Sequence, residues 1–291
     1  MSGLGADAGT GTGPGGGPVE LTAPAKLTVS LRVTGVRTDG YHLLESEMVT
    51  LDLVDTLVVG DGHGLTIDER FTGPAEGSGA GSWRSGGIDP GPDNLVARAL
   101  RASGRTARVD LIKRIPPGAG LGGGSADAAA ILRWSGSIDP ALAAGLGADI
   151  PFCVVGGRAL VRGIGEDVTP LPYEDRAFTL FLLPFGMDTR AVYAAWDRLH
   201  AEGPLAGSME GGPGEPGVND LELPALSIEP RLGAWRDHLA GRTGRRPWLA
   251  GSGSTWFVEG TPADLGLEGE SEVRLGAERA LVVGVRTVAA H

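Results

Sequence analysis

Apolar and polar residues alternate in several short stretches of the chain, which is the pattern of half-buried strands. Between residues 27 and 33, leucine and valine alternate with threonine, serine and arginine, and a repeat of two is the period of a β-strand. Pro116 and Pro117 end a strand that precedes them, because proline cannot donate to a sheet ladder. Further strands are expected over residues 55–59, 109–115 and 280–288, and residues 248–259 predict a strand, a turn and a strand.

Helical signals occur between these strands. Asp93 can cap a helix over residues 94–102, and Thr189 can cap one over residues 190–200, whose apolar residues share one face. Residues 125–134 are rich in alanine and also predict a helix. Helices and strands are interspersed without a regular alternation of the two. This order favours an α+β fold with antiparallel strand pairing over a doubly wound parallel sheet.

Glycine, which occurs 50 times in 291 residues, gathers in three segments. Residues 1–18 predict a disordered tail, and residues 71–93 and 201–218, which also contain prolines, predict long surface loops. A break in the pattern of predicted helices and strands divides the rest of the chain into two parts. We therefore expect two folded domains, at residues 19–168 and 169–291.

The chain is acidic, with 36 acidic against 25 basic residues and a formal net charge of −11. A field of that sign repels nucleic acid and anionic membranes, so we expect neither as a partner. Cys153, the single cysteine, excludes an internal disulfide and a zinc site built on cysteines. Because neither a leader pattern nor a long apolar run is present, we expect a cytoplasmic protein. Both a monomer and a homodimer stay open.

The strongest chemical signal is a glycine-rich segment between a predicted strand and a predicted helix. Residues 115–125 read Ile-Pro-Pro-Gly-Ala-Gly-Leu-Gly-Gly-Gly-Ser. Glycine lets backbone amides approach a bulky anion, and the first amides of a helix have no partner within the helix. These donors and the positive end of the helix dipole favour an anion. The segment therefore predicts a phosphate site that works against the overall charge, with a flexible turn as the alternative.

Known phosphate-binding patterns narrow this prediction. A P-loop nucleoside triphosphatase is excluded, because no lysine follows the glycines. Gly118, Gly120 and Gly123 have the spacing of a dinucleotide-binding fingerprint. That fingerprint needs a strand ending in an acidic residue about 20 positions later, and the sequence has none there. A dinucleotide-dependent oxidoreductase is therefore kept only as an alternative.

Other segments carry candidate groups that are ordinary when each is taken alone. Lys26, one of only two lysines, lies in Pro-Ala-Lys-Leu just before the first alternating pattern, and Tyr41 and His42 follow an Asp-Gly turn in Arg-Thr-Asp-Gly-Tyr-His. Asp149 has an apolar setting in Leu-Gly-Ala-Asp-Ile-Pro-Phe, where a buried carboxylate needs a partner or a function. Residues 249–255 form a second glycine and serine loop. Each has an ordinary structural alternative. Lys26 would be a lysine at a strand edge, and Tyr41 and His42 would be packing residues after a hairpin turn. Asp149 would be a helix cap, and the second loop would be a tight turn.

Taken together and in this order, these motifs resemble the GHMP superfamily of small-molecule kinases over roughly residues 21–258. Within it, they and Asn-Asp-Leu-Glu at residues 219–222 resemble the branch that phosphorylates the 2-hydroxyl of 4-diphosphocytidyl-2-C-methyl-D-erythritol, in the non-mevalonate route to isoprenoid precursors. The resemblance implies a ribosomal-protein-S5-like N-terminal half and a ferredoxin-like C-terminal half. It also implies ATP and Mg²⁺ as cofactors and a small-molecule substrate with a cytidine diphosphate group.

The resemblance also assigns roles to individual residues. It implies that Lys26 and Asp149 are the catalytic pair, with Asp149 as the base. Tyr41 and His42 match positions that contact the cytidine end of the substrate, and Thr189 matches a further position on the substrate side.

On the nucleotide side, Lys113 and Asn94 match positions near the base. Ser125 is a candidate ligand for Mg²⁺, by analogy with hydroxyls that follow other phosphate loops. The expected phosphate-binding residues are Pro116, Pro117, Gly118, Ala119, Gly120, Leu121, Gly122, Gly123, Gly124, Ser125 and Ala126.

Three features depart from the pattern of this branch. Thr28 and Ala126 stand where an asparagine and a second serine are usual, and the chain between the loop helix and Asp149 is short. These departures concern substrate contacts and efficiency more than the reaction class. The remaining alternatives are a GHMP kinase acting on homoserine, mevalonate or a sugar, and a nucleotide-binding protein without catalytic activity.

Overall fold

A computed structural model of the chain describes residues 17–71, 87–201 and 218–290. Nearly all of the predicted tail and most of the two predicted glycine-rich loops lie outside these ranges. Within them, helices and strands are interspersed as the sequence predicts.

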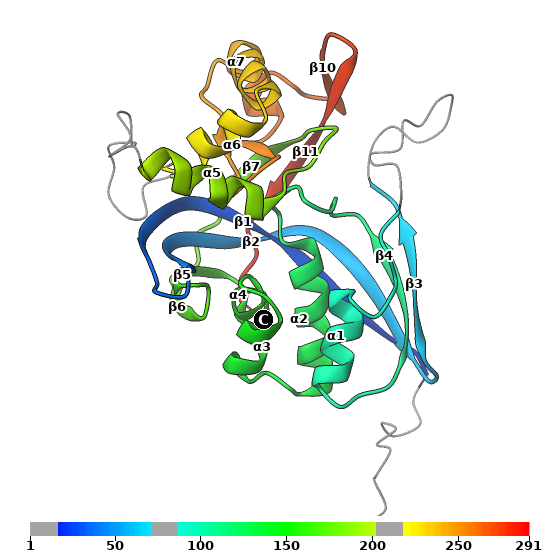
Figure 1. Cartoon of the computed structure of the whole chain (residues 1–291). Coiled ribbons are helices and arrows are strands. Elements are labelled where there is room, and N and C mark those ends of the chain that lie inside the picture. Colours follow the sequence, from blue (N-terminus) through cyan, green and yellow to red (C-terminus); the bar gives the residue numbers. More distant parts are fainter. Residues whose placement is uncertain (1–16, 72–86, 202–217, 291) are drawn as a thin grey trace, which may run out of the picture.

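Two long strands organise the first sheet. β1 (Val19–Val36) and β2 (His42–Gly60) form an antiparallel hairpin, which Figure 1 shows as a curved ribbon across the middle of the molecule. Both exceed the strands predicted at residues 27–33 and 55–59. Three register shifts interrupt their ladder, and each shift breaks the alternation by which a strand is recognised. The sheet also contains β3 (Gly64–Glu69), β4 (Arg108–Lys113), β5 (Arg158–Gly163) and β6 (Asp167–Leu171).

Strand pairing in this sheet is antiparallel except between β3 and β4, which run parallel. The strand predicted to reach Ile115 ends at Lys113. Beyond that point, the N–H groups of Arg114 and Ile115 donate to the carboxylate of Asp55 instead of to a neighbouring strand. This turn directs the following glycine-rich segment away from the sheet.

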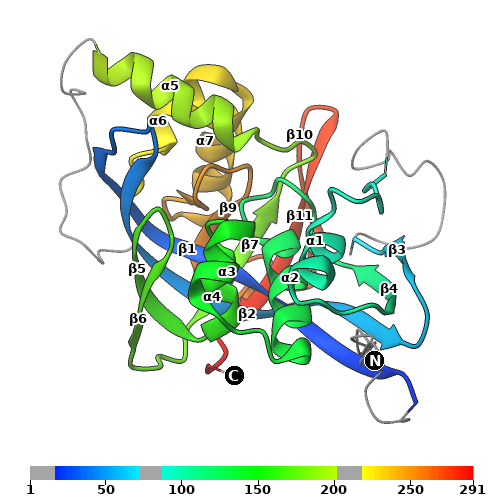
Figure 2. The same ribbon diagram turned by 60° about the horizontal axis from the view of Figure 1, so that its bottom comes forward.

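One face of the first sheet is covered by helices, which Figure 2 shows in front of the curved hairpin. The cap of the first helix is Asn94, not Asp93 as predicted, because the Asn94 side chain accepts the N–H of Val96 at 2.9 Å. The helices are α1 (Leu95–Ala102), α2 (Gly123–Ser135), α3 (Pro140–Leu146) and α4 (Ile150–Val155).

A second sheet follows along the chain. Its strand order is β10, β11, β7, β9 and β8, and all of its ladders are antiparallel. The division expected at residue 168 falls within β6, the last strand of the first sheet. The elements are β7 (Ala177–Leu182), α5 (Thr189–Ala201), α6 (Glu222–Ile228), α7 (Arg231–Thr243), β8 (Trp248–Leu249), β9 (Trp256–Glu259), η1 (Ala263–Leu265), β10 (Glu272–Leu275) and β11 (Glu278–Arg286).

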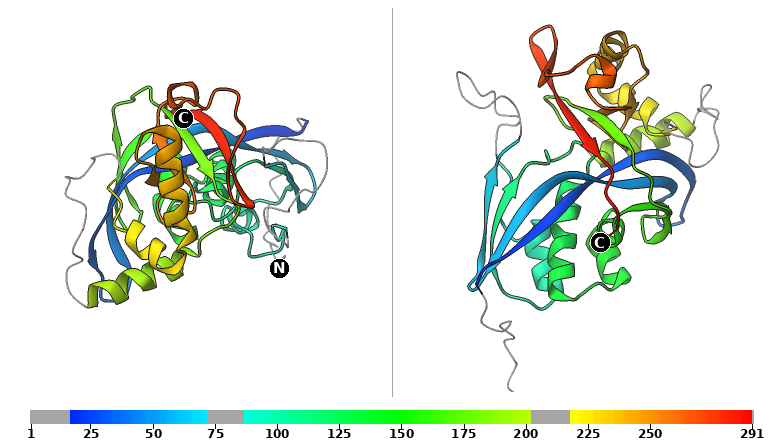
Figure 3. Two further views of the ribbon diagram at one scale, coloured as in Figure 1. Left: turned by 90° about the horizontal axis from the view of Figure 1, so that it is seen from above. Right: turned by 180° about the vertical axis from the view of Figure 1, so that it is seen from behind.

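The two sheets share a hydrophobic core. Leu27 and Val29 of β1 pack with Phe178 of β7 and Leu281 of β11, and all four are almost fully buried. Both views in Figure 3 show β7 and β11 crossing the long hairpin. Leu121 of the glycine-rich loop belongs to the same core, so the loop is fixed where the two sheets meet. The α+β prediction is confirmed.

Candidate active site

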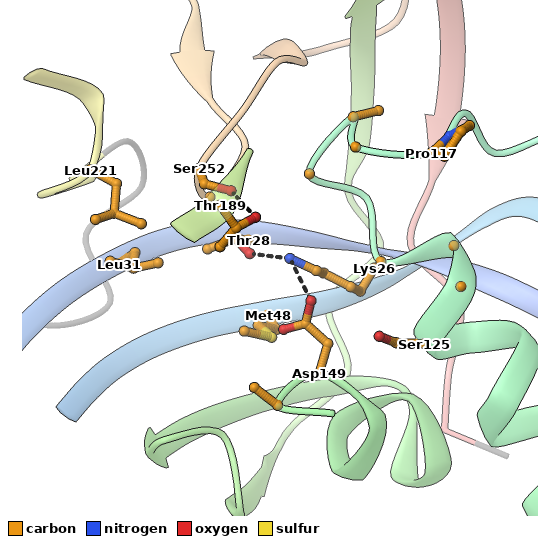
Figure 4. A pocket seen from close by; sticks show the side chains of 18 of the residues that line it. Lys26, Thr28, Leu31, Met48, Pro117, Ser125, Asp149, Thr189, Leu221 and Ser252 are labelled. Atoms are coloured by element: carbon orange, nitrogen blue, oxygen red, sulfur yellow. Dashed lines mark hydrogen bonds and ion pairs between the residues drawn. The ribbon is translucent and has the colours of Figure 1, made fainter. Parts of the chain in front are cut away.

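A cavity of about 440 Å³ brings many of the predicted site residues together. Figure 4 shows Lys26 and Asp149 pointing toward each other inside it. The lining residues come from β1, β2, α1, α5, the glycine-rich loop with the start of α2, the chain before α4, the chain before α6, and the second glycine and serine loop. They are Lys26, Thr28, Leu31, Leu44, Met48, Leu95, Pro116, Pro117, Gly118, Ala119, Gly120, Gly122, Gly123, Gly124, Ser125, Ala148, Asp149, Thr189, Tyr193, Leu221, Gly251 and Ser252.

Lys26 lies on β1 directly after a register shift and pairs with Thr50 of β2. Its side chain is only 6% exposed. The ammonium donates to the Thr28 hydroxyl at 2.9 Å and lies 3.4 Å from a carboxylate oxygen of Asp149. Lys26 and Asp149 therefore meet, as the family resemblance implies. Thr28, which departs from the family pattern, is the residue that holds the ammonium from the other side.

Asp149 occupies the position before α4 but makes no capping hydrogen bond through its side chain. Its carboxylate is therefore not used as a helix cap, which was the structural alternative. The expected apolar burial is only partly correct, because the side chain is 32% exposed and lines the cavity. The carboxylate is thus open to a ligand while its position is set by the lysine.

The glycine-rich loop is fixed through its carbonyl groups. The carbonyl oxygen of Gly118 accepts the N–H of Met187 at 3.2 Å, and that of Leu121 accepts the N–H of Lys26 at 3.0 Å. The loop is therefore tied both to β1 and to the chain before α5, and the flexible-turn alternative does not describe it.

Two glycines of the loop are required by the protein's own packing as well as by ligand access. Gly120 has a φ of +81°, and a Cβ there would lie 2.3 Å from the carbonyl oxygen of Ala250. Gly122 has a φ of +65°, and a Cβ there would lie 2.7 Å from Cγ of Lys26. A side chain at Gly122 would displace Lys26, which lines the cavity, and one at Gly120 would displace the backbone of Ala250, next to the lining residue Gly251.

The helix after the loop begins at Gly123, two residues earlier than predicted. Ser125, in the first turn of α2, lines the cavity, which places a hydroxyl beside the exposed amides of the helix end. Leu121 and Ala126 are both about 1% exposed and point into the protein. These two members of the predicted phosphate-binding segment therefore support the loop from inside and do not line the cavity.

Lys113 is buried beneath this loop. Its ammonium bonds to the carboxylates of Asp55 and Asp127, the latter at 2.7 Å, and a Cβ on Gly123 would lie 2.7 Å from it. Burial raises the pKa of Asp127 to about 7 against the opposing effect of the ammonium. Burial lowers the pKa of Lys113, but the two carboxylates together outweigh it, so that the pKa of Lys113 is raised. Asp55 and Asp127 are not recognisable as site residues from the sequence, because neither lies in a recognisable motif.

The remaining nucleotide-side and substrate-side positions are distributed around the cavity. Asn94 caps α1 directly before Leu95, which lines the cavity. The Thr189 hydroxyl forms a 3.0 Å hydrogen bond with Ser252. The predicted cap at Thr189 is wrong, because the carboxylate of Asp188 accepts the N–H of Arg190 at 2.8 Å.

Tyr41 and His42 lie beyond the lining residues. Tyr41 is 58% exposed, with the Arg37 guanidinium 5.4 Å from its ring centroid. The His42 ring bonds to Asp197 at 2.7 Å and stands 4.7 Å from the ring of Tyr193. Tyr193 lines the cavity and was missed by sequence reasoning, because it reads as part of an ordinary helix. Burial, with the nearby Asp149 carboxylate, raises the pKa of its hydroxyl, so the hydroxyl keeps its proton.

The described parts of the chain contain neither a metal-binding cluster of histidine, cysteine or acidic side chains nor a membrane-spanning helix. Among those residues, no cluster of three or more histidine, cysteine, aspartate or glutamate side chains is arranged to hold a metal ion. No helix found there has the length and apolar character needed to cross a membrane.

Comparisons with known sequences show which family the chain belongs to. The model of the GHMP kinases N terminal domain matches residues 94–157. A 4-diphosphocytidyl-2-C-methyl-D-erythritol kinase from Paracoccus denitrificans is 37% identical over 244 residues, covering 81% of this chain and 84% of that protein. A kinase of the same name from a Polaromonas species is 35% identical over 283 residues, covering 84% and 88%.

Solved structures give the same result. A crystal structure titled 4-(cytidine 5'-diphospho)-2C-methyl-D-erythritol kinase superimposes with a TM-score of 0.65 at 31% identity, covering 93% of this chain and all of that one. The mevalonate kinase of L. major, at 13% identity and a TM-score of 0.57 over 94% of this chain and 97% of that one, shares the fold. The chain therefore has the GHMP kinase fold and belongs to the 4-diphosphocytidyl-2-C-methyl-D-erythritol kinase family.

Proposed function

We propose that this chain transfers the γ-phosphoryl group of ATP to the 2-hydroxyl of 4-diphosphocytidyl-2-C-methyl-D-erythritol. The observation that carries the proposal is the 3.4 Å approach of Lys26 and Asp149 in the cavity that the glycine-rich loop lines. A base, a cation and a phosphate loop in one cavity are the groups that phosphoryl transfer to an alcohol needs.

The glycine-rich loop and the start of α2 are proposed to hold the ATP phosphates. Gly118, Gly120 and Gly122 to Ser125 line the cavity, and backbone amides at a helix N-terminus bind anions without a charged side chain. Such backbone amides would allow a chain with a net charge of −11 to bind a nucleoside triphosphate. We place the adenine side toward Asn94 and Leu95, at the start of α1.

In the proposed transfer, Asp149 orients the substrate hydroxyl and accepts its proton as the hydroxyl oxygen attacks the γ-phosphorus. The bond from that phosphorus to the bridging oxygen breaks, and ADP leaves. Lys26 stabilises the charge on the transferring oxygens. Because the transition state is loose, the proton leaves late. The position of Asp149 therefore matters as much as its basicity.

A magnesium ion fits this site by the chemistry of its donors. The Ser125 hydroxyl lines the cavity, and Mg²⁺ prefers oxygen ligands while keeping several waters and phosphate oxygens in its shell. We therefore propose Ser125 as the ligand from this chain. When bound, the ion neutralises charge on the phosphates.

The cytidine end of the substrate is proposed to lie beyond Tyr193, toward Tyr41 and His42. The tilted His42 and Tyr193 rings, 4.7 Å apart, and the exposed ring of Tyr41 provide aromatic surface on which a base can stack. Thr189, which is hydrogen-bonded to Ser252 and lines the cavity together with Tyr193, is proposed as a polar contact for the rest of the substrate.

Turnover of a substrate panel tests the proposal. ADP release is measured with ATP and each of 4-diphosphocytidyl-2-C-methyl-D-erythritol, mevalonate and homoserine, and the phosphorylated position is identified by ³¹P and ¹H NMR. We expect turnover with the cytidine diphosphate compound alone, at its 2-hydroxyl. Turnover of mevalonate or homoserine in its place would assign another GHMP activity. Thermal stabilisation by NAD(P)⁺ but not by ATP would favour the oxidoreductase alternative.

A further inference from the structure

The Asn-Asp-Leu-Glu segment at residues 219–222 takes no part in the chemistry above, yet it runs beside the strand that carries Lys26. The N–H of Leu31 donates to the carbonyl oxygen of Val218 at 2.7 Å, and the N–H of Asp220 donates to that of Leu31 at 3.0 Å. These two hydrogen bonds hold Asn219 against β1, although the two segments are far apart in the sequence.

The side chain of Asn219 is inside the protein, with the residue only 5% exposed. Its amide nitrogen donates to the carbonyl oxygens of Leu249 and Gly251, at 2.9 and 2.7 Å. Its amide oxygen accepts the N–H of Leu221 at 2.9 Å. These contacts use both donors and the acceptor of one planar amide. Aspartate, with nearly the same shape, has no donor for the two carbonyls.

The carbonyls that Asn219 holds flank Ala250 in the second glycine and serine loop, and this loop supports the phosphate loop. The N–H of Thr255 donates to the carbonyl oxygen of Ala119 at 3.1 Å. The carbonyl oxygen of Ala250 lies so close to Gly120 that a Cβ there would be 2.3 Å away. Two consecutive residues of the phosphate loop thus rest on the segment that Asn219 fixes.

We propose that Asn219 is a positioning residue for ATP, which holds the loop at residues 249–255 as a support behind Ala119 and Gly120. This inference rests on the proposed function, because it assumes that the phosphate loop binds ATP. Asn219 itself touches no ligand in this scheme. It acts by fixing the backbone amides of the phosphate loop before the nucleotide arrives, and a misplacement of about 1 Å in such a site costs about 10²-fold in rate.

The test compares Asn219→Asp with Asp220→Asn. Asp220 is the matched control, because its carboxylate binds Arg32 and the N–H of Val33, both at 2.9 Å, on the same strand. In these contacts Asp220 does not touch the second loop. The Kd for the non-hydrolysable analogue adenylyl-imidodiphosphate is measured with Mg²⁺ by calorimetry, and the melting temperature is recorded for each variant. The KM for ATP and kcat are measured alongside.

We expect Asn219→Asp to raise the Kd and the KM for ATP at least about tenfold, while Asp220→Asn leaves both within twofold of the wild type. A merely structural role of Asn219 would lower the melting temperature and the apparent kcat of Asn219→Asp and leave its KM for ATP unchanged. Asn219→Ser, which has one shorter donor, carries the same expectation if the aspartate variant does not fold.

Three results overturn the inference alone. They are a folded Asn219 variant that binds the analogue within twofold of the wild type, a control variant that weakens binding as much as Asn219→Asp does, and a failure of both Asn219 variants to fold while the control folds. A wild-type protein that does not bind the analogue overturns the proposed function, and this inference with it.

Discussion

The ammonium of Lys26 lies 3.4 Å from the carboxylate of Asp149 and 2.9 Å from the hydroxyl of Thr28. The two acceptors come from different elements, so the lysine is held on both sides and its charge has a fixed position in the cavity. Asp149 in turn makes no capping bond through its side chain. Lys26 is therefore constrained, whereas the carboxylate of Asp149 keeps oxygen lone pairs that can accept a hydrogen bond from a substrate hydroxyl.

Replacing Asp149 with asparagine removes the proton acceptor and keeps the shape of the side chain. We expect kcat to fall by about 10²- to 10⁴-fold, the usual range for a general base, with little change in melting temperature. Steady-state kinetics with saturating ATP measure this effect. Asp237→Asn is the matched control, because the Asp237 side chain is 73% exposed on α7. Turnover of Asp149→Asn close to that of the control would remove Asp149 from the mechanism.

Lys26→Arg keeps the positive charge, but we expect it to lose the activity. The stem of Lys26 passes so close to Gly122 that a Cβ there would be 2.7 Å from its Cγ, and a planar guanidinium is larger than an ammonium. We expect kcat/KM to fall by at least about 10²-fold. Lys26→Met, which fits the space without a charge, separates the loss of charge from the loss of fit. Full activity of the arginine variant would contradict the role of a compact cation.

The sequence allowed prediction of those parts of the site that depend on contiguous residues. The glycine-rich loop, the strand before it and the helix after it follow from the local pattern at residues 109–134, and the structure has all three. The pairing of Lys26 with Asp149 followed from the family resemblance, because spacing alone places no contact between residues so far apart.

Contacts set by tertiary packing stayed hidden from the sequence. Tyr193 has the helical spacing of a core residue, and only its orientation on α5 brings it to the cavity. Lys113 was predicted near the nucleotide base, a role that stays a prediction, and nothing in the sequence connects it to Asp55 and Asp127. Strand lengths were underestimated for a related reason, since register shifts in the β1–β2 ladder disturb the alternation.

Gly120→Ala tests the contact between the two glycine loops directly. The added Cβ would lie 2.3 Å from the carbonyl oxygen of Ala250 and 3.0 Å from that of Gly253, at a φ of +81°. We expect a loss of stability greater than the roughly 1–2 kcal/mol of left-handed strain alone, and at least a tenfold weaker affinity for ATP. Denaturant unfolding and calorimetry measure the two effects.

Gly104→Ala is the control for this change. Gly104 has a φ of +64° and nothing within 4 Å of the position of a Cβ, so it carries the strain without the collision. We expect it to lose about 1 kcal/mol of stability and to bind ATP as the wild type does. Equal losses of stability in the two variants would show that the loops are not in forced contact.

The buried carboxylate of Asp127 makes the free energy of unfolding depend on pH. Its pKa is raised from an ordinary value near 3.8 to about 7, so between these values the folded state binds more protons than the unfolded state. The stability contributed by that proton is complete below the lower pKa and is lost as the pH rises through the higher one. Asp127→Asn has no such proton to lose. Subtracting the pH profile of the unfolding free energy of Asp127→Asn from that of the wild type cancels the titration of groups that the two proteins share.

We therefore expect the unfolding free energy of the wild type to fall relative to that of Asp127→Asn between pH 5 and pH 8, by about 1–4 kcal/mol at 1.36 kcal/mol per pKa unit. Urea unfolding at four pH values in this range measures the difference. Lys113 keeps its charge throughout, because its own pKa is raised. Only the loss of the Asp127 proton therefore changes the net charge beneath the phosphate loop in this pH range. A difference that is constant with pH would mean that Asp127 is already ionised at pH 5. In that case the ammonium of Lys113 would outweigh the burial of the two carboxylates around it.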